Sequence, residues 1–244
     1  MAGLSVICVY NSETILNDCL LAGLKIQKRQ DYEVILIDNS DNRFTSAASA
    51  LNHGARQATT DRFIFTHQDI LMRFSGVLDA VNDFFDQGLS VFGSSGVRKY
   101  SPWMLSNVYT SNYDEHFYAN SLCRRISVPE KVETLDECFV CITREAFDKV
   151  GGFDEKTCDN WHMYTVDLSI TAKRRGIDVF AVPLDLFHAS TGRISKAFIK
   201  SLRAVCRKHH LIWASTPCYH FFAFPPFMWG LYLFWQISYR LERK

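Results

Sequence analysis

The chain has 244 residues, of which 48% are hydrophobic, and its formal net charge is +1. This length suits one large domain, or one domain with an appendage, and the hydrophobic fraction is enough for a full core. The near-zero net charge gives no electrostatic case for nucleic acid as a partner. The eight cysteines include only a lone CxxC, Cys138 and Cys141, so we expect buried thiols in a reducing cytosol. The run after Met1 is strand-like rather than typical of a signal peptide.

Three apolar runs alternate with two helical patterns in the first part of the chain. Residues 4–9, 33–37 and 63–65 are rich in β-branched and aromatic side chains, which favours buried strands. Residues 15–24 and 44–58 carry apolar side chains at helical spacing. This β-α-β-α-β order predicts an α/β fold with a mostly parallel central sheet, flanking helices and right-handed crossovers.

Polar side chains follow each of these three strands, at Tyr10, Asp38 and Asp69. The carboxyl ends of parallel strands share one edge of a sheet, which is where open α/β sheets bind ligands. No glycine-rich dinucleotide or P-loop motif is present. Strand-end carboxylates suit a diphosphate bound through a metal ion, because hard cations take oxygen ligands and bridge phosphates.

The later part of the chain shows the same two patterns at wider spacing. The expected elements are a helix over 77–85, a strand over 91–92, a strand over 138–142, a helix over 144–150 that ends at Gly151-Gly152, a helix from Trp161 to Arg175, and a strand over 179–182. Residues 94–133 are expected to be irregular. Their ring side chains form either a sugar-stacking lid or a small core, and they are Trp103, Tyr109, Tyr113, His116, Phe117 and Tyr118.

Taken together, the motifs resemble a family 2 glycosyltransferase. The segments similar to its nucleotide-sugar half are 6–11, 34–40, Asn52-x-Gly54-x-x-x-Ala58 and 63–69. The segments similar to its acceptor half are 151–155, Asp167-Leu168, Arg175-Gly176 and His188, and Tyr164-x-x-Asp-Leu after Trp161-His162 looks like a bacterial subgroup. The resemblance implies a GT-A fold over residues 1–193, with a nucleotide-sugar half (1–93), an acceptor half (94–193) and a C-terminal helical segment (194–244).

The resemblance also implies the residues of the donor site. The donor-binding positions are Val9, Tyr10, Asn11, Glu13, Asp38, Asn39, Arg56 and Gln68. Asp69 matches the last position of the family's Asp-x-Asp metal motif, whose first position here is His67, and His188 matches a histidine that completes the site. The implied cofactor is Mn²⁺ or Mg²⁺. Imidazole suits Mn²⁺ better, and the alternative is that the metal is dispensable.

The acceptor helix departs from the family pattern, because its usual Glu-Asp pair falls at Tyr164-Thr165. The nearest carboxylate is Asp167, which we take as the candidate catalytic base, with Asp136 and Glu137 as alternatives. The alternative role for Asp167 is a carboxylate facing the helix dipole. The candidate acceptor-binding residues are Trp161, His162 and Asp136, and Arg193 is a further candidate near the leaving group.

The segment from Tyr219 to Trp235 is apolar and aromatic, Pro225-Pro226 interrupts it, and basic residues flank it. This pattern favours a segment that lies in a membrane interface. The alternative is a helix packed on the domain or in a homodimer.

We therefore expect an inverting glycosyltransferase, cytoplasmic and peripheral on the inner face of the cell membrane. Its donor is expected to be a UDP-sugar, and its acceptor a hydroxyl of a glycan or polyprenyl-linked lipid in surface polysaccharide synthesis. One alternative is a sugar nucleotidyltransferase, although the segment from Tyr10 to Glu13 lacks that class's glycine-rich loop with Lys or Arg. Another alternative is a degenerate subunit that binds a sugar nucleotide without turnover.

Overall fold

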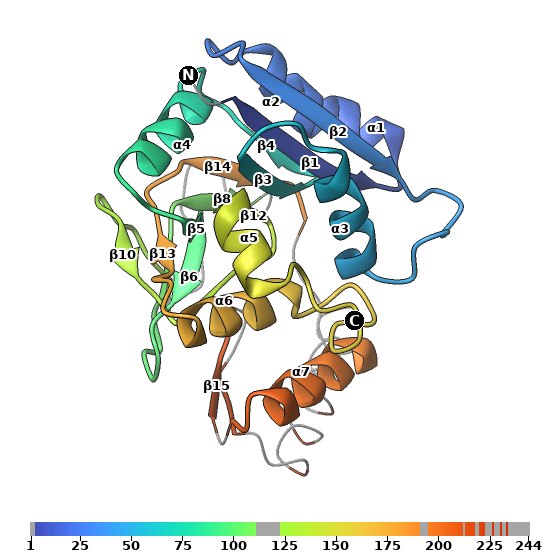
Figure 1. Ribbon diagram of the computed structural model, residues 1–244, viewed down its shortest axis with the longest axis vertical. Helices are drawn as coiled ribbons and strands as arrows, with labels where there is room; N and C mark the ends of the chain where they lie inside the picture. The colour runs from blue at the N-terminus through green and yellow to red at the C-terminus, as the bar shows by residue number, and fades with distance from the viewer. Residues whose placement is uncertain are drawn as a thin grey trace, which may run out of the picture.

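The computed structural model describes residues 3–110, 123–190, 195–211, 213–217 and 220–222, together with positions 226, 230 and 233. Figure 1 shows a central sheet with helices packed against it, as the sequence predicts. The sheet has seven strands in the order β10 (Glu130–Lys131), β13 (Phe180–Ala181), β5 (Val91–Gly93), β12 (Phe139–Thr143), β3 (Arg62–His67), β1 (Leu4–Tyr10) and β2 (Tyr32–Asp38).

The direction of the strands confirms most of the predicted parallel sheet. β1 pairs in parallel with β2 and β3, and β13 pairs in parallel with β5. β12 runs antiparallel to both β3 and β5, and β10 runs antiparallel to β13. The sheet is therefore mixed: five strands run one way, and β12 and β10 run against them.

Side chains on the central strands alternate between two cores, one on each face of the sheet. Ile7 and Phe65 belong to one core, whereas Val6, Cys8 and Ile64 belong to the other. The first core is covered by α3 (Ala47–Gln57), α5 (Arg144–Val150), α6 (Tyr164–Arg174) and α7 (Lys196–Lys208). The second is covered by α4 (Val77–Asp86) and by one helical run made of α1 (Glu13–Leu16), the π-helical η1 (Asn17–Leu21) and α2 (Ala22–Lys25).

The Asn52-x-Gly54 motif holds α3 against two other elements. A Cβ at Gly54 would lie 2.5 Å from Cγ2 of Ile7, so glycine allows α3 to approach β1 closely. Asn52 donates from Nδ2 to the backbone oxygen of Phe153 at 2.9 Å and accepts from its backbone N–H at 3.0 Å. The motif therefore ties the first half of the chain to the segment that follows α5.

The described parts of the stretch 94–133, residues 94–110 and 123–133, contain short strands, which corrects the expectation of an irregular segment there. Its strands are β6 (Ser95–Val97), β7 (Met104–Ser106), β8 (Val108–Thr110), β9 (Cys123–Arg124) and β10. With β11 (Thr134–Leu135), three of them form a sheet in the order β11-β6-β7-β9. Trp103 and Tyr109 lie against Arg124 and Arg125. Tyr113, His116, Phe117 and Tyr118 lie outside the described residues.

The C-terminal segment begins with a helix and continues as a short hairpin. The apolar residues of α7, among them Phe198 and Leu202, belong to the first core, so α7 packs on the domain. β15 (Trp213–Ser215) and β16 (His220–Phe222) pair antiparallel, which corrects the expectation of a wholly helical tail. The rest of the 219–235 stretch is outside the described residues, apart from the isolated positions. Within the described part of the chain, no helix has both the length and the apolar character needed to cross a membrane.

Candidate active site

Two of the predicted metal ligands lie where β3 ends: His67 is its last residue, and Asp69 is in the short loop before β4 (Ile70–Leu71). β14 (Leu186–His188) pairs antiparallel with β4, and the register places His188 opposite Ile70. The backbone N–H of Ala189 donates to the backbone oxygen of Asp69 at 3.0 Å. This pairing brings together the three side chains that the resemblance assigned to the metal, although they come from distant parts of the sequence.

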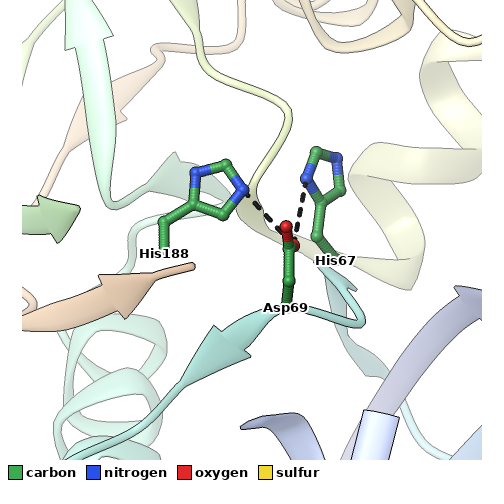
Figure 2. Close-up of side chains that lie close together, drawn as sticks. All are labelled: His67, Asp69 and His188. Atoms are coloured by element: carbon green, nitrogen blue, oxygen red, sulfur yellow. Dashed lines mark ion pairs between the residues drawn. The ribbon is translucent and has the colours of Figure 1, made fainter. Parts of the chain in front are cut away.

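Figure 2 shows the His67, Asp69 and His188 side chains converging on one point. Oδ1 of Asp69 lies 3.3 Å from Nε2 of His188 and 3.9 Å from Nδ1 of His67. One ligand atom from each residue lies within 4.8 Å of the others. Two imidazole nitrogens and one carboxylate oxygen form a donor set that fits a divalent transition metal such as Mn²⁺.

Burial and mutual charge shift the pKa values of the three residues in this cluster in different directions. Burial raises the pKa of Asp69, but hydrogen bonding and charge from His188 outweigh it and hold that pKa well below its usual value. Burial lowers the pKa of His188, but Asp69 outweighs burial and raises it. Burial, followed by the charge on His188, lowers the pKa of His67. A neutral imidazole keeps a lone pair available for a metal ion.

A cavity of about 320 Å³ opens beside the cluster, at the carboxyl ends of β1 and β3. Of the predicted donor residues, those that line it are Val9, Tyr10, Asn11, Asn39 and Gln68. The other residues lining it are Asn42, Ala47, Leu51, Phe65, Thr66, His67, Asp69, Trp161 and Tyr164. Sequence patterns gave no signal for Asn42, and Tyr164 was noted as part of a subgroup motif and as a departure from the family's carboxylate pair, but not as a site residue.

Three predicted donor residues do not line this cavity. The Asp38 carboxyl lies at its margin, where it hydrogen-bonds the side chain of Tyr10. Glu13 is exposed on the first turn of α1. Arg56 lies on the side of α3 that faces a second cavity of about 840 Å³, so the structure does not bring it to the strand ends. The helical spacing of α3 alone could not show which of its faces packs against β1.

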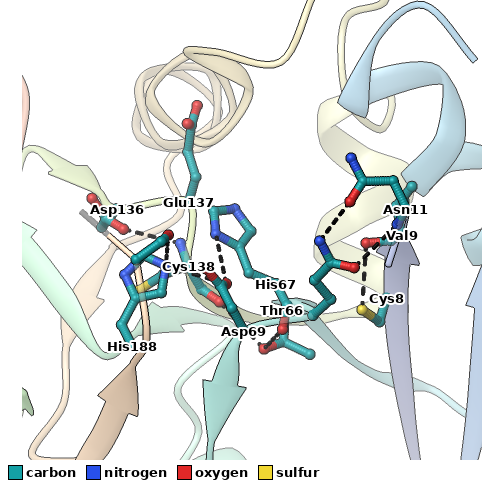
Figure 3. Close-up of polar contacts among 12 residues, drawn as sticks. Cys8, Val9, Asn11, Thr66, His67, Asp69, Asp136, Glu137, Cys138 and His188 are labelled. Carbon is teal, nitrogen blue, oxygen red and sulfur yellow. Dashed lines mark hydrogen bonds and ion pairs between the residues drawn. The ribbon is translucent and has the colours of Figure 1, made fainter. Parts of the chain in front are cut away.

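Asp136 and Glu137, between β11 and β12, point in different directions in Figure 3. Asp136 faces the cluster. Burial and the residues of the cluster have the larger effects on the pKa values of His67 and His188, and the charge of Asp136 adds a smaller effect that raises both. Glu137 points away from the cluster, toward the backbone of Met163 and Tyr164. Burial raises the pKa of Glu137 well above its usual value.

Asp167, the residue that the sequence analysis takes as the candidate base, does not line this cavity. It is 2% exposed, and its carboxylate oxygens accept from Nζ of Lys208 at 2.7 Å and from Nε2 of His209 at 2.8 Å. These bonds join α6 to the end of α7, and Asp167 borders the second cavity. A carboxylate with both oxygens occupied, and no access to the cluster, is poorly placed to take a proton from a substrate there.

The side chains of the two predicted acceptor residues that precede α6, Trp161 and His162, lie in different surroundings. Met163 has a φ of +70°, so α6 begins at Tyr164 and His162 is not on the helix. The His162 ring packs against Phe198 of α7 at 5.5 Å. Trp161, which is 42% exposed, remains at the cavity. Arg193 lies outside the described residues.

Comparison with known proteins identifies a family whose sequence model the chain matches. The sequence model of a family described as "Glycosyltransferase like family" matches residues 5–189. No curated protein sequence matches the chain.

Several solved structures are similar in fold. One is GalNAc-T7 with UDP, GalNAc and Mn²⁺, with a TM-score of 0.58 and 15% identity over 84% of this chain and 48% of that one. S. aureus TarS 1-349 in complex with UDP-GlcNAc gives 0.58 and 14%, over 84% of this chain and 66% of that one. The mannosyltransferase PcManGT from Pyrobaculum calidifontis in complex with GDP-Man and Mn²⁺ gives 0.57 and 15%, over 93% and 68%. This chain thus spans about half the length of GalNAc-T7, and at these identities the likeness concerns the GT-A fold.

Proposed function

Because this chain belongs to the Glycosyltransferase like family, we propose that it transfers a sugar from a nucleoside diphosphate sugar to a hydroxyl group, with inversion at the anomeric carbon. The observation that carries this proposal is the His67, Asp69 and His188 cluster at the rim of the cavity formed by the ends of β1 and β3. A nucleoside fits a pocket lined by amide and aromatic side chains. Its diphosphate would then extend toward the cluster.

The donor we propose is a UDP-sugar. Two of the similar structures described above contain UDP or UDP-GlcNAc, and the third contains GDP-Man. His67, Asp69 and His188 would hold Mn²⁺ or Mg²⁺, and such an ion neutralises charge on a leaving diphosphate. Amide groups of Asn11 and Gln68 lie at the same end of the cavity and can orient the donor.

We propose Asp136 as the base. It takes the proton of the acceptor hydroxyl while that oxygen attacks the anomeric carbon, and the bond to the diphosphate breaks with its electron pair going to the diphosphate. The position of Asp136 supports this role, because its side chain is partly exposed and faces the cluster. Glu137 points toward α6 instead, and the carboxylate of Asp167 is hydrogen-bonded to Lys208 and His209. The exposed ring of Trp161 provides a surface on which an acceptor sugar can stack.

The acceptor we propose is a glycan or a polyprenyl-linked sugar in surface polysaccharide synthesis, reached at the inner face of the cell membrane. The aromatic stretch 219–235 with its basic flanks supports this proposal. Removing residues 219–244 should release the protein from vesicles that contain anionic lipid, while donor hydrolysis remains. If the shortened chain dimerises less instead, with unchanged vesicle binding, the stretch belongs to a homodimer interface.

The test of the whole proposal is turnover of nucleotide sugars. The protein should release nucleoside diphosphate from one donor of a panel when Mn²⁺ is present, and Asp69→Asn should lose that release while keeping its Tm. The matched control is Asp148→Asn, an exposed carboxylate on α5. Release of pyrophosphate from a nucleoside triphosphate and a sugar phosphate would instead identify a nucleotidyltransferase. Donor binding without any product would identify a degenerate subunit.

A further inference from the structure

The two positions where this chain departs from the family pattern, His67 and Tyr164, touch each other. Nε2 of His67 lies 3.1 Å from the hydroxyl oxygen of Tyr164. We propose that Tyr164 is a positioning residue that fixes the tautomer and orientation of His67, so that this histidine presents Nδ1 to a divalent cation. This inference rests on the proposed metal site, and it joins the two departures into one paired adaptation.

The direction of the hydrogen bonds follows from the chemistry of the groups. The Tyr164 hydroxyl donates to the backbone oxygen of Glu137 at 3.3 Å, and a carbonyl oxygen can only accept. With its single proton used there, the hydroxyl oxygen accepts from Nε2–H of His67. A neutral imidazole with its proton on Nε2 has its lone pair on Nδ1. Nδ1 is the atom of His67 that lies 3.9 Å from Oδ1 of Asp69.

The groups that set this direction are held firmly. Tyr164 is 3% exposed, and its ring packs edge-to-face on Phe153 with centroids 5.4 Å apart. The side chain of Glu137, whose backbone oxygen receives the Tyr164 hydroxyl, lies against the backbone of Met163 and Tyr164 at the start of α6.

A carboxylate at position 67 would need no such partner. Both of its oxygens are acceptors when ionised, so it can bind a cation in either orientation. An imidazole binds through one nitrogen, and which nitrogen is free depends on the hydrogen bond that the other makes. Replacing carboxylate by histidine at position 67 therefore creates a requirement that Tyr164 meets.

The experiment is calorimetric titration of Mn²⁺ into the full-length protein without donor. Tyr164→Phe should weaken Mn²⁺ binding by about 10- to 100-fold, which is the usual effect of removing a partner of a metal-binding histidine. The matched control is Tyr32→Phe, which also removes a hydroxyl that donates to a backbone oxygen, that of Leu24 at 3.2 Å. Tyr32 lies at the start of β2, at the end of the strands opposite to the metal cluster. Tyr32→Phe should bind Mn²⁺ as the wild type does.

A double-variant comparison separates positioning from general structural support. In a His67→Asp background, the further change Tyr164→Phe should leave Mn²⁺ affinity unchanged within about twofold. An equal loss in both backgrounds would overturn the inference, as would full Mn²⁺ affinity in Tyr164→Phe alone. If the wild type binds no Mn²⁺, the proposed metal site itself fails, which is a different result.

A measurement on the unaltered protein covers the case in which the Tyr164 variant does not fold. Nitrogen-15 chemical shifts of labelled histidine in the metal-free wild type should report His67 protonated on Nε2 and bare on Nδ1. The opposite tautomer would overturn the inference. Chemical shifts report the protonated nitrogen directly, so a merely structural contact would not produce the expected pattern.

Discussion

Gln68 holds Asn11 through both ends of its side-chain amide. Its Oε1 accepts from the backbone N–H of Asn11 at 3.1 Å, and its Nε2 donates to Oδ1 of Asn11 at 2.7 Å. Oε1 also accepts from the backbone N–H of Ser12 at 3.1 Å. The loop after β1 is therefore attached to the loop that carries Asp69, and both line the proposed donor cavity.

Removing this attachment should weaken donor binding. In Gln68→Ala the loop after β1 loses three hydrogen bonds, so the donor itself must order the loop when it binds. At roughly 0.5 kcal/mol per hydrogen bond, the donor KM should rise by about tenfold. The control is Gln57→Ala at the exposed end of α3, which should leave the KM unchanged. An unchanged donor KM in Gln68→Ala would show that the loop is already ordered without the amide.

The proposed base is tested by Asp136→Asn. This change removes the proton acceptor but keeps the size of the side chain, so kcat should fall by on the order of 10²- to 10⁴-fold with little change in donor KM. Steady-state transfer assays measure both constants, and Asp148→Asn on the exposed side of α5 is the control. A kcat near the wild-type value would exclude Asp136 and direct attention to Glu137.

Asp167 should behave as a stabilising residue rather than a base. Asp167→Asn removes the buried carboxylate that accepts from Lys208 and His209, although Lys208 keeps Asp154 at 2.9 Å, and breaking a buried pair costs about 3 to 5 kcal/mol of unfolding free energy. For a chain of this size the expected fall in Tm is roughly 6 to 20 °C. Calorimetry measures it, with the exposed pair variant Asp159→Asn as control. Full stability together with lost transfer would restore Asp167 as a base candidate.

Asp154 should make stability depend on pH in the acid range. Burial raises its pKa, but hydrogen bonds from Thr157 and Lys208 outweigh burial and hold the pKa well below its usual value. Because the folded-state pKa is depressed, the stabilisation is present above the unfolded pKa of about 3.9 and is lost as the pH falls through the folded pKa. Urea unfolding should therefore lose more free energy below about pH 4 in the wild type than in Asp154→Asn. Parallel curves would contradict this account.

The fold was predictable because its first half is encoded locally. The strands around Val6, Ile35 and Ile64 and the helices between them each show their own periodicity, and the resemblance supplied the family. The short strands within 94–133 were not predictable, because each has only two or three residues and most of their pairings are with partners far along the chain. β8, for example, pairs with β14, and β6 pairs with β11.

The site was predictable only where strand ends define it. Tyr10, Asp38 and Asp69 follow predicted strands, and the structure gathers them at one edge of the sheet. The placement of Asp167 depends on the docking of α7, which no spacing within α6 reveals. Tyr164 was visible only as an absence of the family's carboxylates, because its contact with His67 joins residues far apart in the sequence.

The pairing of β14 with β4 also affects the order in which the molecule matures. His67 and Asp69 leave the ribosome long before His188, and the three side chains meet only after β14 has added to the edge of β4. A nascent or shortened chain that lacks residue 188 therefore has two donors of the cluster and no third. Binding of a cation by all three residues would then report that β14 has paired with β4, so the cluster would serve as an indicator of this folding step.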